Sequence, residues 1–253
     1  MKKLVCILLV ICTLFSLCGC SKDKKETAAS GTIEGKGYKS PEKAILAYAE
    51  SLQSGDVKKI LSTFAIETYV DKMDMGAYLS ATAAYSVSTG LVSSDDYSRE
   101  IRLVQRQYQI TQQLGYMYIN HTEAGFPEKL QPIPVPPAKS SEYGTIDAFI
   151  EDMTVEDWDE ILEEMEIGDV RTDADLIRDN LTAAYYDNLD RRAAQYGCDE
   201  IVPLAIEITL DGVDCYLCAD VACYGGKWYI LFPSGTLGAI LGVDAMSCGL
   251  VER

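Results

Sequence analysis

The chain has 253 residues, of which 48% are hydrophobic and 24% charged, with 22 basic against 39 acidic side chains. This composition excludes a disordered or collagen-like protein, and a single long apolar run near the N-terminus excludes a multi-span membrane protein. A formal charge of −17 argues against a nucleic-acid partner, because few basic side chains could neutralise a row of phosphates. The length suffices for one sizeable core or two small ones.

The N-terminus has the pattern of an export signal. Lys2 and Lys3 precede an apolar run over residues 4–17. A run of about 14 residues is too short to span a hydrocarbon core about 30 Å thick, so it predicts a signal peptide and not a transmembrane helix.

The segment Leu17-Cys18-Gly19-Cys20 that ends this run resembles the lipobox of bacterial lipoproteins, although Ala or Ser is commoner than cysteine at position 18. In that family the last cysteine receives diacylglycerol before cleavage. The resemblance implies a signal peptide over residues 1–19 and lipidation of Cys20 by acyl chains such as palmitate, and two chains suffice for stable anchoring. The alternative is an ordinary signal peptide that ends in cysteine.

Residues 20–37 are interpreted as the lipidated cysteine followed by a flexible tether, because they have no hydrophobic period and are rich in Lys, Gly, Ser, Thr and Ala. Only six of the 22 basic and three of the 39 acidic side chains precede Tyr38, so the remainder carries a formal charge of −20. We therefore expect the domain to work beyond the bilayer, on the extracytoplasmic face of the cell membrane, held there by its lipid anchor.

Two helices are predicted at the start of the folded part. Ser40 and Pro41 suit a helix N-terminus, Gly55 suits its end, and Asp56 can cap a second helix. Their apolar stripes are Ile45, Tyr48, Ala49 and Leu52, then Val57, Ile60, Leu61 and Phe64.

Residues 40–65, SPEKAILAYAESLQSGDVKKILSTFA, resemble the opening helices of nuclear-transport-factor-2-like domains, the cone-shaped fold shared with ketosteroid isomerases. The resemblance covers 26 residues and implies that one face of a sheet closes a pocket against the helices.

Further helices are expected over residues 68–89, broken near Gly76, and after Ser94. The buried side of the latter helix is predicted to hold Ile101, Val104, Tyr108, Thr111 and Gly115. Another face carries Arg99, Arg102 and Arg106, which we interpret as a solvated face that pairs with nearby acids. The alternative is a binding site for an anion.

Five of the eight prolines fall within residues 127–137 and predict an extended connector. Either it divides a helical part, 38–126, from an α+β part, 142–253, or it is a loop within one domain over 38–253.

The acid-rich stretch that follows holds twelve acids and no basic residue between positions 142 and 169. Helices are predicted over residues 154–166 and 172–196. No metal site is expected, because the acids do not have the spacing of a twelve-residue calcium-binding loop; at Asp169, for example, Arg171 occupies the third position.

The C-terminal region predicts a three-stranded antiparallel meander over residues 201–210, 213–224 and 227–233. Asp211-Gly212 and Gly225-Gly226 separate these runs as two-residue hairpin turns. In this register Trp228, Ile230 and Phe232 share a face with the alternate apolar residues of the first two strands. The fold class is therefore α+β, with N-terminal helices packed on a C-terminal sheet. The meander also resembles the closing strands of the cone fold.

The opposite face of the meander holds the candidate binding residues, which are Tyr216, Tyr224, Tyr229, Glu207, Asp214 and Asp220. Tyrosine rings beside a few carboxylates would suit a small amphipathic ligand. The alternatives are a half-exposed face, a contact for another envelope protein, or a ketosteroid-isomerase-like enzyme that uses Glu207, Asp214 or Asp220 as acid or base.

Neither the cysteines nor the histidine predict a reaction centre. Cys215 and Cys218 point to opposite faces of a strand and cannot form a disulfide, which leaves Cys198 with Cys248 as the one pairing that the strands permit. His121, near a helix end, lacks the motif of a catalytic triad. We therefore expect a non-catalytic binding or interaction module without a cofactor.

Overall fold

The computed structural model describes residues 33–81, 96–120, 162–242 and 249–253. Several sequence-based predictions lie outside these residues, namely those for the signal peptide, Cys20, most of the tether, His121, the connector at 127–137 and Cys248. Within the described part, no helix combines the length and the apolar character needed to cross a membrane.

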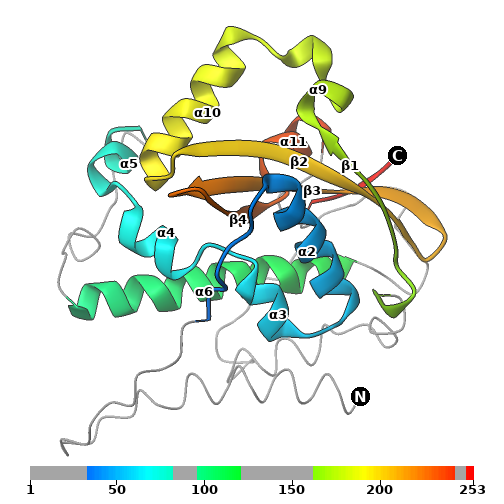
Figure 1. The fold of residues 1–253 in the computed structure, drawn as a ribbon, viewed down its shortest axis with the longest axis horizontal. Helices are drawn as coiled ribbons and strands as arrows, with labels where there is room; N and C mark the ends of the chain where they lie inside the picture. Colours follow the sequence, from blue (N-terminus) through cyan, green and yellow to red (C-terminus); the bar gives the residue numbers. More distant parts are fainter. Residues whose placement is uncertain (1–32, 82–95, 121–161, 243–248) are drawn as a thin grey trace, which may run out of the picture.

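An antiparallel sheet forms the centre of the fold (Figure 1). Its strands are β1 (Glu166–Thr172), β2 (Glu200–Leu210), β3 (Val213–Tyr224) and β4 (Lys227–Pro233), in the spatial order of the sequence. A short strand β5 (Leu250–Glu252) pairs with the first residues of β3, in line with β4. This architecture confirms the predicted α+β class and the meander.

The predicted register of the meander is confirmed at both turns. Leu210 pairs with Val213, and Tyr224 pairs with Lys227. The prediction is wrong for Phe232, because the register shifts after Ile230 and places Phe232 opposite Asp220. This β-bulge moves the Phe232 ring to the opposite face of the sheet from Ile230.

Strand β1 corrects the end of the helix predicted over residues 154–166, because Glu166 belongs to the sheet, while residues 154–161 of that prediction lie outside the described structure. Its residues pair with β2 from Glu166 opposite Thr209 to Thr172 opposite Leu204. This polar segment has only a weak intrinsic preference for the β conformation, and pairing with the free edge of β2 stabilises it as a strand. Pro203 lies just beyond the last pair, so its missing N–H removes no bond to β1.

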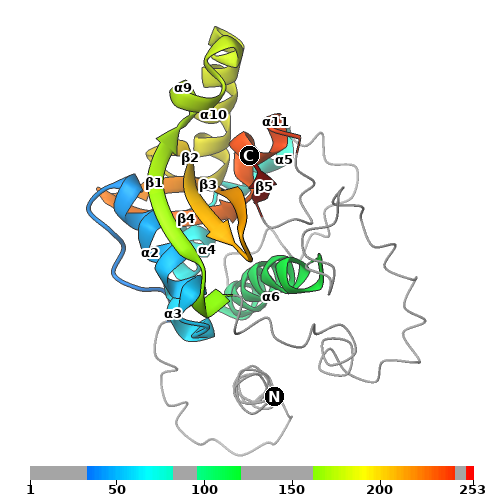
Figure 2. The same cartoon turned by 90° about the vertical axis from the view of Figure 1, so that its right-hand side faces the viewer.

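Helices cover both faces of the sheet (Figures 1 and 2). Helix α2 (Pro41–Gln53) crosses one face and buries the predicted stripe of Ile45, Tyr48, Ala49 and Leu52. The other face is covered by α10 (Ala183–Tyr196) and the short α11 (Gly235–Ile240). Residues from both sides of the proline-rich connector therefore share one core.

The remaining helices differ in detail from the prediction. After α3 (Val57–Ser62) come α4 (Glu67–Lys72) and α5 (Met75–Ala81), so the break lies at residues 73–74 and Gly76 is inside α5. The long α6 (Asp96–Asn120) runs below the sheet in the view of Figure 1.

The helix predicted over residues 172–196 is interrupted. It consists of α9 (Asp173–Leu176), a 3₁₀ turn η3 (Arg178–Asn180) and α10. A new helix starts because the Thr182 side chain accepts a hydrogen bond from the Tyr185 N–H and caps α10.

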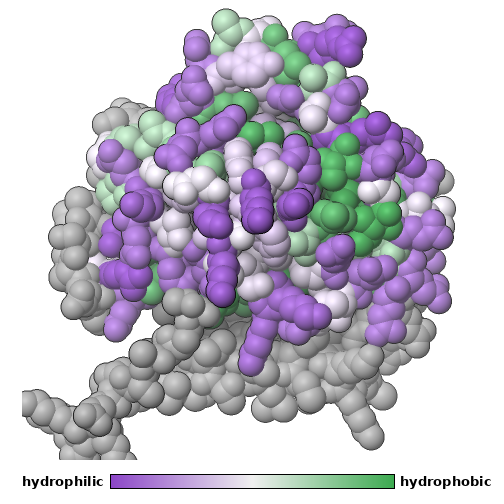
Figure 3. Space-filling model, viewed as in Figure 1, coloured by the Kyte–Doolittle hydropathy of each residue, from purple (hydrophilic) through white to green (hydrophobic). Residues whose placement is uncertain are grey.

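Segments from the N-terminal part cover the outer edge of β4. Tyr38 exchanges backbone hydrogen bonds with Trp228, while Thr63 and Ala65 bond to the backbone of Ile230. These contacts satisfy polar groups that an open edge strand would expose. The surface seen in Figure 3 is mainly hydrophilic, and a large hydrophobic area lies over the region of α2 and β1.

Gly197, which ends α10, allows a test of the packing between that helix and α4. It adopts a left-handed conformation at φ 65°, and an added Cβ would overlap the carbonyl oxygen of Lys72. We expect Gly197→Ala to lower the free energy of unfolding by at least about 3 kcal/mol, through this overlap and the conformational cost. Urea unfolding would measure it.

The matched control is Gly212→Ala in the β2–β3 turn, where φ is 75° but no heavy atom lies within 4 Å of the added Cβ. This variant should lose only about 1–2 kcal/mol, the cost of a left-handed residue. Equal losses in the two variants would contradict the described contact with Lys72.

Candidate functional site

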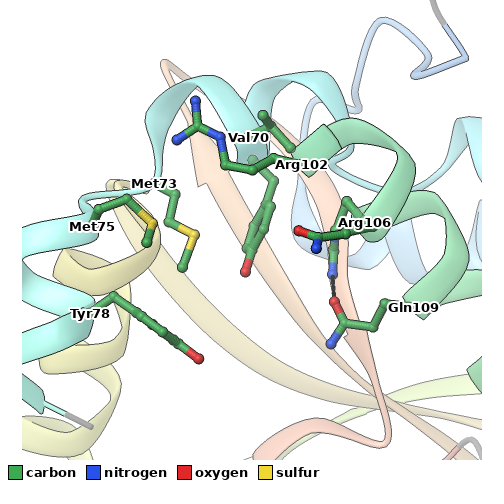
Figure 4. A pocket seen from close by; sticks show the side chains of 9 residues that line it. Val70, Met73, Met75, Tyr78, Arg102, Arg106 and Gln109 are labelled. Atoms are coloured by element: carbon green, nitrogen blue, oxygen red, sulfur yellow. Dashed lines mark hydrogen bonds between the residues drawn. The ribbon is translucent and has the colours of Figure 1, made fainter. Parts of the chain in front are cut away.

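A cavity of about 300 Å³ lies between α4, α5 and α6 (Figure 4). The segment from α4 to α5 contributes an apolar and aromatic wall, made of Tyr69, Val70, Met73, Met75 and Tyr78. Helix α6 contributes a polar wall, made of Arg102, Gln105, Arg106 and Gln109. Cations thus face thioethers and phenol rings across a small space.

Arg106 is the central residue of the polar wall. Its side chain is only 2% exposed, and its Nε and Nη2 donate hydrogen bonds to the carbonyl oxygens of Ala65, at 3.1 Å, and Leu231, at 2.5 Å. Its Nη1 donates to Gln109 Oε1 at 3.3 Å, as Figure 4 shows. Arg106 therefore joins α6 both to the segment before α4 and to strand β4.

No carboxylate among the described residues forms an ion pair with Arg106. Two aromatic rings lie over its guanidinium instead, with the Tyr69 centroid at 4.2 Å and the Phe232 centroid at 5.0 Å. Burial lowers the pKa of Arg106 from its usual value, while burial raises the pKa of Tyr69 to about 12. The direct contacts of the Arg106 cation are thus all with neutral groups, and the Glu34 carboxylate acts on it only from beyond hydrogen-bond distance.

The three arginines of α6 have different environments, which corrects part of the sequence interpretation. Arg99 pairs with Asp71 through two hydrogen bonds at 2.6 and 2.8 Å, and this contact lowers the pKa of Asp71. Arg106 is buried, and Arg102 Nε is buried without a hydrogen-bond partner in the described structure. Of the three arginines, only Arg99 therefore matches the predicted solvated face that pairs with acids.

The prediction for the buried side of α6 is wrong at Ile101, which is 37% exposed, while Ile110, Leu114 and Arg106 of the same helix are buried. The arginine spacing was the one sequence signal for this site, and the wall from α4 and α5 was not identified. Its apolar residues do not differ by type or spacing from ordinary core residues.

The candidate residues on the sheet share a face but do not line this cavity. Asp220 is fully buried under α11 and accepts hydrogen bonds from Arg192 Nη2 at 2.6 Å and from the Thr236 N–H at 2.8 Å. Arg192 also donates to the Thr236 hydroxyl. This closed network binds two helices to β3.

Glu207 and Asp214 lie at the other end of that face and form surface ion pairs. Glu207 bonds to Arg171 and Arg253, each at 2.9 Å, and chiefly the hydrogen bond from Arg171 lowers its pKa. The pKa of Asp214 is lowered by a hydrogen bond from Thr209 and by Arg253. Both carboxyl groups are therefore held in the charged form.

The three tyrosines of the sheet are separated in the same way. Tyr224 and Tyr229 are buried, with centroids 6.3 Å apart, and the Tyr224 hydroxyl donates to the Tyr196 carbonyl oxygen. Tyr216 lies under Arg253, whose guanidinium carbon is 5.6 Å from the ring centroid. The structure therefore divides the six candidate residues between a buried network, a surface charge cluster and the core.

Four cysteines fall within the described residues, and all are buried free thiols. Cys215 and Cys218 belong to cores on opposite sides of the sheet, as predicted. Burial raises the pKa of each of these two thiols to about 12. The described part of the chain has no cluster of three or more residues suited to hold a metal ion.

No protein-family model matches the chain, and no curated protein matches its sequence. Among solved structures, a similar chain is a cystatin-like protein from Ruminococcus gnavus ATCC 29149, with a TM-score of 0.43 and 12% sequence identity. The match covers 75% of this chain and 39% of that chain, so this chain spans less than half of its neighbour's length. Similarity at this level carries no information on function.

The Asp220 network tests whether this part of the candidate face is structural. We expect Asp220→Ala to lower the free energy of unfolding by about 3–5 kcal/mol, because it leaves the Arg192 cation without its buried partner. Asp214→Ala, with a side chain 59% exposed, should cost less than about 1 kcal/mol. Urea unfolding measures both, and a loss at Asp220 as small as that at Asp214 would refute the structural role.

Proposed function

We propose that this protein is a lipid-anchored lipoprotein of the extracytoplasmic membrane face, and that its folded domain is a non-catalytic module that binds a small ligand between α4, α5 and α6. The observation that carries the binding role is Arg106, a buried cation without an ion-pair partner in the described structure, at the wall of a cavity. Cavities that combine an apolar lining with a few convergent polar groups are the usual form of small-ligand sites.

Support for the anchor comes from the sequence. The basic, apolar and small-residue pattern ends at Cys20, and a polar stretch follows it directly. The acidic domain would be repelled by an anionic membrane surface, so the lipid and not the protein surface would supply the attachment. The structure joins Ile33 and Glu34, at the end of the predicted tether, to Glu67 of α4. The part of the tether before Ile33 would keep the domain near the bilayer while leaving it hydrated.

The enzyme alternative receives little support from the described cavity. Its candidate acids and bases were Glu207, Asp214 and Asp220, and none of the three lines the space between α4, α5 and α6. A general acid or base also needs a pKa near the working pH. Arg171 and Arg253 lower the pKa of Glu207, and Thr209 and Arg253 lower that of Asp214. These shifts move both pKa values further from neutral pH.

The anchoring half of the proposal depends on one side chain. In bacteria that produce the full chain, Cys20→Ala should abolish the acyl mass on the N-terminal peptide and release the protein from the lipidation pathway. Mass spectrometry of that peptide measures the effect. Cys18→Ala is the matched control and should keep its acyl mass, since alanine is common at that lipobox position. Unchanged lipidation of Cys20→Ala would contradict the proposal.

The binding half can be tested on the native full-length protein, purified gently in detergent micelles. Native mass spectrometry should show an added mass of a small molecule that denaturation removes. The Met75→Trp variant, whose larger side chain fills the cavity, should lose it. A bare chain, or a mass that Met75→Trp retains, would contradict binding at this site. Crosslinking would then test the alternative of an envelope protein partner.

A further inference from the structure

We infer that the cavity between α4, α5 and α6 is selective for a small organic carboxylate with an aromatic body, whose carboxylate is held by Arg106, while Arg102 is a second cation in the cavity lining. This inference rests on the proposed binding function and adds the chemical class of the ligand. It follows from the charge of one wall, the composition of the other and the volume between them.

The positive charge of the polar wall favours an anionic ligand. Removing an arginine from water is costly unless an opposite charge or a full set of hydrogen bonds compensates it. Arg106 has five N–H donors, and its three hydrogen bonds in the described structure go to neutral acceptors. One N–H remains on each terminal nitrogen, which is the donor pair that the two oxygens of a carboxylate can accept.

Arg102 adds a second, less buried cation on the same side of α6. The two residues are four positions apart, so they lie on one helix face. Arg102 Nε is buried and has no hydrogen-bond partner in the part of the chain that the structure describes. A ligand oxygen at the cavity wall would give this N–H an acceptor.

The side chains of the opposite wall favour a ligand that contains an aromatic ring. Met73, Met75 and Tyr78 come from the α4–α5 segment, and Figure 4 shows them across the cavity from Arg106 and Gln109. Thioether sulfurs and phenol rings both make favourable contacts with aromatic rings. A volume of about 300 Å³ is at the lower limit of ligand pockets, which suits a single ring with a short acidic chain.

The number of free donors favours a carboxylate over a phosphate ester. The hydrogen bonds of Arg106 leave it two N–H groups, one on each terminal nitrogen, which match the two oxygens of a carboxylate. A phosphate monoester brings three strong acceptor oxygens and 1.5 to 2 charges near pH 7. Its third oxygen would face the apolar side chains of the α4–α5 wall without a donor, which makes its burial costly.

The test is isothermal titration calorimetry on the full-length protein in detergent micelles, with the heat of addition to empty micelles subtracted. Three probes share one ring and similar size, namely 3-phenylpropionate, its neutral amide 3-phenylpropionamide, and 2-phenylethyl phosphate. We expect the carboxylate to bind and the amide to bind at least about 30-fold more weakly, since the amide leaves the buried cation unpaired. The phosphate should bind more weakly than the carboxylate.

Variants locate the site without relying on Arg106 alone, whose removal could also weaken the fold. Arg102→Met should reduce carboxylate affinity about 3- to 10-fold, and Met75→Trp should abolish binding. The matched control is Arg99→Met, which removes a charge from the same helix outside the cavity and should leave affinity within about twofold. Thermal unfolding of each variant shows that it is folded.

The outcomes separate the ligand class from the existence of the site. Amide binding as tight as carboxylate binding, or tighter phosphate binding, would overturn the carboxylate assignment. Absence of carboxylate binding, or equal losses in Arg102→Met and Arg99→Met, would overturn it as well. A neutral or phosphorylated small molecule found by native mass spectrometry, and lost in Met75→Trp, would leave the proposed binding function standing while refuting this inference.

Discussion

The structure depends on the burial of strand β3 on both of its faces. From Leu217 to Tyr224 every side chain of this strand is buried, so neither side of the sheet can face water there. A strand of this kind requires a cover on each face. Helix α2 supplies one cover and α10 with α11 the other, and the Asp220 network ties the second cover to β3. The layers of the fold follow from this one requirement.

A second constraint, at the edge of β4, positions the polar wall of the cavity. Strand β4 is the outer strand beside β3, and its edge must be satisfied by groups other than a further strand. Backbone groups of Tyr38, Thr63 and Ala65 occupy part of that edge, and Arg106 reaches the Leu231 carbonyl oxygen. Arg106 is buried because it donates a hydrogen bond to the edge of β4. It therefore places a positive charge beside the cavity, in a chain whose formal charge is −17.

The sequence predicted those elements whose pattern is local. Alternating apolar residues and the turns Asp211-Gly212 and Gly225-Gly226 defined the meander and its register, and Ser40 with Pro41 defined the start of α2. Both signals come from residues a few positions apart, which tertiary contacts did not override.

Features that depend on contacts between residues far apart in the sequence were not predicted. Strand β1 forms because β2 offers a free edge, and its sequence, EIGDVRT, has no clear alternation. The bulge that turns Phe232 over follows from pairing with β3 and not from any local turn residue. Arg106 is buried by contacts with Ala65 and with Leu231, which is 125 positions away. The candidate site combines α4, α5 and α6 through such contacts, so residue spacing revealed only its arginines.

The last residues of the predicted tether are joined to one wall of the cavity. The Glu67 carboxylate in α4 accepts hydrogen bonds from the N–H groups of Ile33 and Glu34, and the Glu34 carboxylate accepts from those of Ile66 and Thr68. Tyr69 and Val70 of the same helix line the cavity. In the lipid-anchored arrangement proposed above, mechanical tension on the anchor would thus pass into α4 before it reaches the sheet. Among the described elements, α4 would then be the first to bear that load, and it carries Tyr69 and Val70 of the proposed binding site.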